Sequence, residues 1–147
     1  ISSKQVSEHI KIELSKIISP EIISLLYSSD HDSTLKGLEQ LIDQHDECFD
    51  DDDNLFLPNN DTFIKFITSF LTKSDDEVLS SVLEFTSKYL RALLQHNIPL
   101  VDKNCSRLLT NILKLFSNRN DYIIQTVHDI CNLSFELTRP ELALSVK

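Results

Sequence analysis

Two groups of side chains in this sequence have the residue types of a metal or catalytic site. In the first, His45, Cys48 and the run Asp50–Asp53 stand close together in the chain, and His, Cys and Asp are common metal ligands. The run lacks the alternation and central glycine of a calcium-binding loop, and the spacing fits no zinc pattern. We therefore interpret this segment as a charged loop and predict no metal ion and no cofactor.

The second group is His128 and Cys131, which would share one face of a helix. A Cys–His pair can form an activated nucleophile, but no oxyanion donors and no orienting group can be identified around it. Both residues fall on the expected apolar face, where a free cysteine behaves as a small apolar residue. The single glycine of the chain also excludes a dinucleotide fingerprint and a P-loop. We predict that the protein is not an enzyme and that His128 is buried or half-buried.

The charge balance limits the class of partner. The chain has 147 residues, with 14 Lys and Arg against 23 Asp and Glu, and a formal net charge of −9. Phosphate backbones and anionic lipids bind cationic surfaces, and no apolar run is long enough to cross a bilayer. We predict neither nucleic-acid nor membrane binding. Cys48, Cys105 and Cys131 form no disulfide framework, which is typical of a reducing, cytoplasmic compartment.

The elements that carry these residues repeat along the chain. Ile22, Ile67 and Ile112 are 45 positions apart (67−22 and 112−67). The residues after each isoleucine also match at the same offsets. Two apolar columns come first, then a polar break, then a position in the following helix: Leu25, Phe70 and Leu115; Leu26, Leu71 and Phe116; Asp30, Asp75 and Asn120; Gly37, Val82 and Val127. Apolar residues around each break have helical spacing, and a two-helix unit of about 40–47 residues is the HEAT/armadillo size class.

We therefore predict an all-α solenoid of the HEAT/armadillo type, with about three helix pairs and a leading helix. Residues 1–147 would form a single domain or part of one. Because an apolar run stops in mid-helix at the end of the chain and the sequence contains no Met, we expect a piece of a longer polypeptide in which the array continues. The expected segments are a leading helix over 4–18, repeat A over 20–45, an acidic loop over 46–60, repeat B over 61–95, repeat C over 102–138 and the start of repeat D over 140–147.

Local signals set the helix starts. Ser19 before Pro20 is an N-cap followed by an N1 proline, and Ser33 and Asp61 are the expected caps of two later helices. In the helix after Asp61, Phe63 and Phe70 fall on the core face, whereas Phe66 is one position off and is expected to be partly exposed.

Stacked pairs place the turns inside each repeat along one edge of the solenoid. The expected turns are residues 28–32, 73–77 and 117–121. Each is short and polar and is held by helices on both sides, so the row can bind a flat protein surface with little ordering cost. The opposite concave face is an alternative binding surface.

Three segments resemble the first three HEAT repeats of a TOG domain, the tubulin-binding module of the microtubule polymerase family, and most closely its fourth TOG module. The segments are SLLYSSDHDSTLKGLEQLI, DEVLSSVLEFTSKYLRALL and NDYIIQTVHDICNLSFEL. The resemblance implies a monomeric module of a larger cytoplasmic, cytoskeletal protein of the spindle or centrosome. It implies that the turns inside the repeats contact tubulin, through His31, Asp32, Lys73, Asp76, Glu77, Val78, Arg119, Asn120 and Gln125.

The sequence departs from the family at these turns. His31 stands where the family has a large aromatic residue, and Ile124 and Gln125 stand where it often has Arg or Lys. Tubulin is acidic, and carboxylates predominate in these turns, so like charges would oppose the encounter. Three alternatives remain open for a TOG-like module: weak tubulin binding, binding aided by sister modules, or a spacer role. A fourth is a generic HEAT/armadillo scaffold for a non-tubulin protein.

Overall fold

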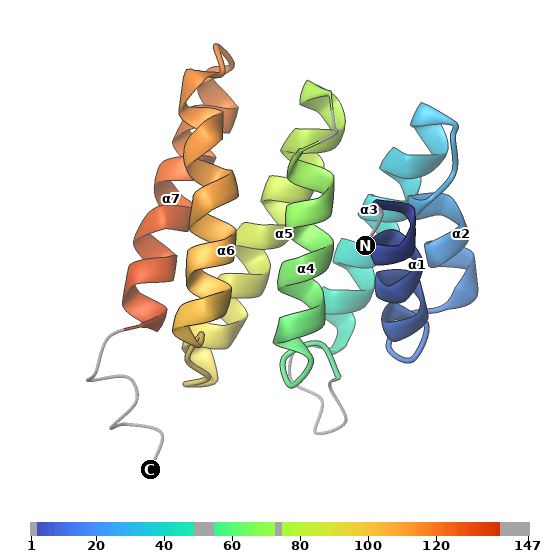
Figure 1. Cartoon of the computed structure of the whole chain (residues 1–147), viewed down its shortest axis with the longest axis horizontal. Coiled ribbons are helices and arrows are strands. Elements are labelled where there is room, and N and C mark those ends of the chain that lie inside the picture. The colour runs from blue at the N-terminus through green and yellow to red at the C-terminus, as the bar shows by residue number, and fades with distance from the viewer. Residues whose placement is uncertain (1–2, 49–54, 73–74, 139–147) are drawn as a thin grey trace.

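The computed structural model describes residues 3–48, 55–72 and 75–138, and these ranges contain helices and no strands (Figure 1). In chain order the elements are α1 Ser3–Leu14, α2 Pro20–Leu26, α3 His31–Cys48, α4 Asn60–Leu71, α5 Asp76–Gln95, α6 Asp102–Leu113, the 3-10 helix η1 Lys114–Ser117 and α7 Asp121–Leu137. No helix in the described ranges is both long enough and apolar enough to cross a bilayer.

The helices form two layers. In one layer α4 packs between α1 and α6, and in the other α5 packs between α3 and α7. The short α2 packs on α3, α4 on α5 and α6 on α7, so the pairs α2/α3, α4/α5 and α6/α7 stand side by side (Figure 1). The predicted all-α solenoid of three pairs with a leading helix is confirmed.

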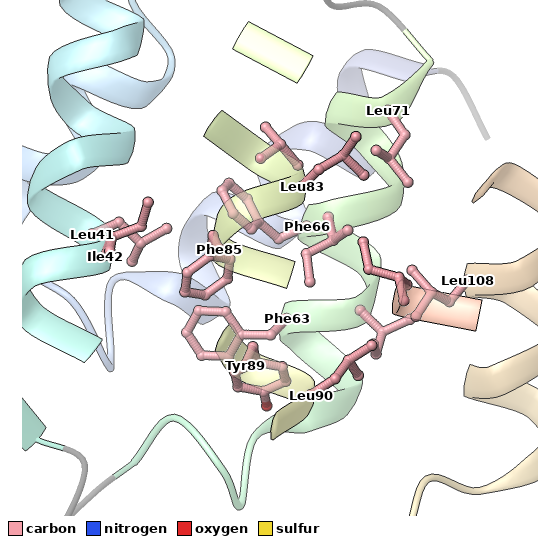
Figure 2. Packing of buried hydrophobic residues seen from close by; sticks show 14 of the residues in the cluster. Leu41, Ile42, Phe63, Phe66, Leu71, Leu83, Phe85, Tyr89, Leu90 and Leu108 are labelled. Atoms are coloured by element: carbon pink, nitrogen blue, oxygen red, sulfur yellow. The ribbon is translucent and has the colours of Figure 1, made fainter. Parts of the chain in front are cut away.

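The core is centred on aromatic residues of α4 and α5. Phe63, Phe66, Phe85 and Tyr89 are fully buried, and Figure 2 shows them between Leu41 and Ile42 of α3 on one side and Leu108 of α6 on the other. The prediction that Phe66 is partly exposed was wrong. Its exposed fraction is 0%, because α4 is covered by α1, α5 and α6 rather than along one narrow stripe.

The core also covers polar groups. The Tyr89 hydroxyl donates a hydrogen bond of 2.7 Å to the Phe56 carbonyl oxygen. His45 is 1% exposed, and its ring lies against those of Phe56 and Phe85. Burial lowers the pKa of His45, against an opposing effect of the neighbouring Asp46.

Close packing joins α2 to α3 at Gly37. A Cβ atom at this position would lie 2.9 Å from the backbone nitrogen of Leu26 and 2.9 Å from the Cβ of Leu25. Real Cβ atoms do not approach backbone atoms so closely, so glycine is required here for the two helices of the first pair to touch.

The helix starts match the sequence in part. Ser19 caps α2 by accepting a hydrogen bond from the Ile22 nitrogen, with Pro20 at N1. The prediction for Ser33 was wrong: α3 begins at His31, and the Asp30 carboxylate accepts hydrogen bonds from the nitrogen and hydroxyl of Ser33. The prediction for Asp61 was also wrong.

Asp61 lies inside the first turn of α4, which begins one residue earlier, at Asn60. Its carboxylate pairs with the Lys65 ammonium at 3.1 Å, four residues further along the helix. The hydrogen bond from Lys65 lowers the pKa of Asp61. The carboxylate therefore stabilises the first turn as a charge near the helix N-terminus and not as a cap.

Other boundaries also differ from expectation. The leading helix ends at Leu14 instead of residue 18, and Ile17 donates back to the Leu14 carbonyl in a tighter turn. The second helix of repeat A extends to Cys48. The aspartate run 50–53 and the expected start of repeat D at 140–147 lie outside the described residues.

His128 is exposed, contrary to the prediction. Helix α7 packs on α5 and buries Ile123, Val127 and Ile130, whereas the ring of His128 contacts that of Phe116 at 4.9 Å between centroids. Leu38 of α3 and Leu83 of α5 stand at the equivalent positions and are buried. They are covered because α5 packs against α3 and α7 packs against α5. Within the described residues no helix follows α7.

Candidate functional site

The turns inside the three pairs lie along one edge of the molecule, the upper edge in Figure 1. We define the turn edge as residues 27–32, between α2 and α3; residues 75–78, at the start of α5; and residues 117–122, between η1 and α7. Residues 96–101, the link between the second and third pairs, lie on the opposite edge (Figure 1). The stacking expected from the 45-residue repeat therefore brings the turns into one row.

Hydrogen bonds from side chains fix the shape of the first turn. The Ser28 hydroxyl oxygen accepts from the Asp30 nitrogen at 3.1 Å, and the Asp30 carboxylate accepts from Ser33. The Thr34 hydroxyl lies within hydrogen-bond distance of the carbonyl oxygens of Ser28 and Asp30. The backbone here is held by its own side chains, as is typical of Ser- and Asp-rich turns.

The other two turns are fixed by helix caps. The Asp75 carboxylate accepts from the Val78 nitrogen at 3.0 Å and caps α5. The side-chain oxygen of Asn120, Oδ1, accepts from the nitrogens of Tyr122 and Ile123, at 3.0 and 3.3 Å, and caps α7. Each cap satisfies amides that the helix itself cannot, and so anchors the turn to a rigid helix.

Side chains also link each turn to the next. His31 Nδ1 lies 3.0 Å from Asp75 Oδ2, and His31 Nε2 lies 3.5 Å from Glu77 Oε1, so the imidazole ring lies between two carboxylates of the second turn. The Asn118 side-chain nitrogen donates 3.1 Å to Asp76 Oδ1 and joins the third turn to the second. The three turns therefore form one connected surface.

This connected surface is acidic. Among the described residues of the turn edge, the permanently charged cation is Arg119, which is exposed. The carboxylates are Asp30, Asp32, Asp75, Asp76, Glu77 and Asp121, all of them exposed. Charge on the edge thus favours a basic surface, and an acidic partner must be bound by shape, aromatic contact and hydrogen bonds.

Comparison with solved structures identifies the architecture. One solved structure, described as "TOG-tubulin binding specificity promotes microtubule dynamics and mitotic spindle formation", superposes with a TM-score of 0.80 at 16% sequence identity and covers 93% of this chain. The chain has the fold of a TOG domain. It spans about half of the solved chain, 55% of its length. No protein-family model and no curated protein matches the sequence.

Within this TOG fold, several of the residues expected to contact a partner do lie on the turn edge. Asp32, Asp76, Glu77 and Arg119 are exposed there. His31 lies there too, and its ring nitrogens contact the carboxylates of Asp75 and Glu77. Asn120 is half-buried and serves as the cap of α7.

Three expected contact residues are placed differently. Val78 is 7% exposed and packs into the core below the second turn. Gln125 is exposed, but it lies one helical turn beyond the edge, in a hollow between α5 and α7 that Arg91 and Asp129 also line. Lys73 lies outside the described residues.

Sequence reasoning missed an aromatic residue on the edge. Tyr122 is 49% exposed at the start of α7, beside Arg119. The signal was present, since Ile123 belongs to the core face of α7 and its neighbour must therefore point about 100° away from it. Tyr122 therefore gives the turn edge an exposed aromatic side chain.

The described residues contain no group of three or more His, Cys, Asp or Glu able to hold a metal ion. Cys105 is buried, Cys131 is half-buried, and burial raises the pKa of both thiols. A raised thiol pKa disfavours the thiolate, which is the nucleophile. The ring of His128, three residues before Cys131, contacts the ring of Phe116.

Proposed function

We propose that this chain is a TOG-type module that binds tubulin through the turn edge, without catalysis, and so takes part in regulating microtubules in the cytoplasm. The observation that carries the proposal is the row of three turns, capped and cross-linked in a TOG fold. A surface that is already ordered loses little conformational entropy on binding. The neighbour of known structure, whose description names tubulin, supports the identity of the partner.

The third turn supplies the principal contacts in this proposal. Arg119 and Tyr122, three residues apart, are both exposed on it, and Arg and Tyr are among the residues that most often dominate the energy of an interface. His31 holds the first two turns in register by bridging Asp75 and Glu77. The acidic side chains lower the rate of encounter with acidic tubulin, so we expect weak binding by the isolated module and tighter binding when sister modules are present.

A double variant tests this proposal. Arg119→Ala/Tyr122→Ala removes the exposed cation and aromatic residue of the third turn, and we expect the chain to lose co-migration with αβ-tubulin in gel filtration. Truncation of anchor residues typically weakens binding by more than about 1 kcal/mol each. The matched control, Lys16→Ala/Phe135→Ala, removes an exposed cation between α1 and α2 and an exposed aromatic residue near the end of α7 and should bind as the wild type does. Equal behaviour of the two double variants would contradict the proposal.

The acidity of the turn edge favours a second candidate, a scaffold that binds a basic, non-tubulin protein at the same edge. Salt separates the two functions. Attraction between opposite charges is screened as salt rises, whereas repulsion between like charges is relieved. Binding of tubulin should therefore hold or strengthen between about 50 and 300 mM salt, and binding of a basic partner should weaken. Absence of any complex with tubulin, together with salt-sensitive binding of a basic protein, would favour the scaffold.

A further inference from the structure

A hollow on the other layer of the molecule has the chemistry of an anion site. It has a volume of about 280 Å³ and lies between α4 and α6, which stand side by side in Figure 1, with α1 closing one side. Its lining is Ile10, Lys65, Thr68, Ser69, Arg107 and Asn111. None of these residues belongs to the turn edge.

Arg107 is the central group of this hollow. The residue is half-buried, and its Nη1 atom is buried without a hydrogen-bond partner. Its backbone carbonyl accepts a hydrogen bond from the Asn111 side chain, but the guanidinium makes no hydrogen bond or ion pair among the described residues. A buried donor without an acceptor is costly, and more so when it is charged. An acceptor supplied by a ligand would therefore bind favourably at Nη1.

Within residues 3–48, 55–72 and 75–138, no side chain provides an acceptor to Arg107 Nη1. The charge of Arg107 helps to lower the pKa of Asp61. The Asp61 carboxylate, however, pairs with Lys65, whose Nζ lies 3.1 Å from Asp61 Oδ2. The hydroxyls of Thr68 and Ser69 donate to carbonyl oxygens of their own helix, Lys65 and Phe66. The donors left over in the hollow are the guanidinium and the remaining hydrogens of the Lys65 ammonium.

Cations continue along the same face of α6. Lys103 precedes Arg107 by four residues and is exposed, so the two lie one above the other on the helix. Lys65, Lys103 and Arg107 all help to lower the pKa of Asp61, which shows that they share one region. In a chain of net charge −9, this is a local concentration of positive charge. A row of cations fits a segment that carries several carboxylates better than a single small anion.

We propose that this hollow binds a glutamate or aspartate carboxylate from an acidic segment of another protein. The planar guanidinium donates two parallel hydrogen bonds to the two carboxylate oxygens, a geometry that an ammonium cannot match. Lys65 flanks this carboxylate, and Lys103 attracts the next acidic residue of the segment. The site is independent of the turn edge, and a partner bound at one surface leaves the other free.

The test uses a fluorescein-labelled peptide of about ten glutamates and measures its anisotropy with the chain at low salt, where charge contacts are strongest. Arg107→Gln should weaken binding about tenfold or more, the loss expected for a charge-assisted pair. Arg119→Gln removes the same charge from the turn edge and should change the affinity less than about threefold. Equal losses in both variants would show an effect of net charge alone and would overturn the proposal, as would unchanged binding in Arg107→Gln.

Thermal unfolding without the peptide provides the second readout. Because the guanidinium makes no hydrogen bond or ion pair among the described residues, Arg107→Gln should melt at the wild-type temperature or above it. A marked fall in Tm would mean that Arg107 serves the fold and not a ligand, and would overturn the proposal. Loss of tubulin binding in Arg119→Ala/Tyr122→Ala with unchanged peptide binding would separate this site from the proposed function.

Discussion

At the scale of single residues, the acidic turn edge depends on a few polar side chains that each have two tasks. Asp75 caps α5 and also pairs with His31, and Asn118 orders its own turn while contacting Asp76. The ring of His31 lies between two carboxylates of the second turn. His31 therefore joins two turns, and Tyr122 is an exposed aromatic side chain of the third.

The double task of Asp75 can be measured. Asp75→Ala removes a helix cap, which costs about 1 kcal/mol, and also the closer of the two His31 contacts. Glu77→Ala removes only the longer contact, between exposed groups, and should cost less than about 0.5 kcal/mol. Urea unfolding of both variants gives the comparison. A Glu77→Ala loss equal to that of Asp75→Ala would show that the cap contributes little.

His45 makes the stability of the fold depend on pH. Burial lowers the pKa of His45 in the folded chain below its ordinary value of 6.5, so the unfolded chain takes up the proton first as the pH falls. The free energy of unfolding is therefore highest above about pH 7 and decreases as the pH drops through about 6.5 toward the lower folded-state value. We expect His45→Leu to remove part of this decrease between about pH 7.5 and about pH 5.5, as measured by urea unfolding. The same slope in the wild type and the variant would contradict this account.

At the scale of elements, the sequence predicted the pairs well because their signals are local. Apolar residues that recur every 45 positions predicted paired helices. The polar breaks predicted at 28–32, 73–77 and 117–121 lie at the boundaries between the two helices of each pair. Ser19 and Pro20 also predicted the start of α2. The errors came from tertiary contacts: Phe66 is buried because α4 has neighbours on several sides, and His128 is exposed because α7 is covered on one side only within the described residues.

The contact between α2 and α3 makes a prediction at this scale. In Gly37→Ala the new methyl group must push apart the backbones of the first pair, at a cost of about 1–3 kcal/mol for overpacking. The better helix propensity of alanine returns about 1 kcal/mol. We expect a lower Tm and a displaced first turn, with weaker partner binding. Glu39→Ala, at an exposed position of the same helix, should change the Tm little; a Gly37→Ala chain as stable as this control would contradict the packing argument.

At the scale of the whole molecule, stacking turns a one-dimensional repeat into a surface. Polar contacts join residues of neighbouring repeats that are 42 positions apart in the chain. Asn118 contacts Asp76 on the turn edge, and Lys88 contacts Asp46 in the layer formed by α3, α5 and α7. The repeat period predicted that the turns would lie in a row. It could not predict these contacts, which depend on how far one pair rotates against the next. Nor could it predict that Arg107 Nη1 is buried without a hydrogen-bond partner among the described residues.

The account rests on the turn edge being the surface that a partner covers, and hydrogen–deuterium exchange of the chain with αβ-tubulin measures this directly. We predict slower exchange of the amides in residues 27–34 and 118–123 when tubulin is present, and unchanged exchange in residues 96–101 at the opposite edge. Protection confined to the opposite edge would contradict the claim. So would the absence of any protection at tubulin concentrations that saturate the TOG protein of the similar solved structure.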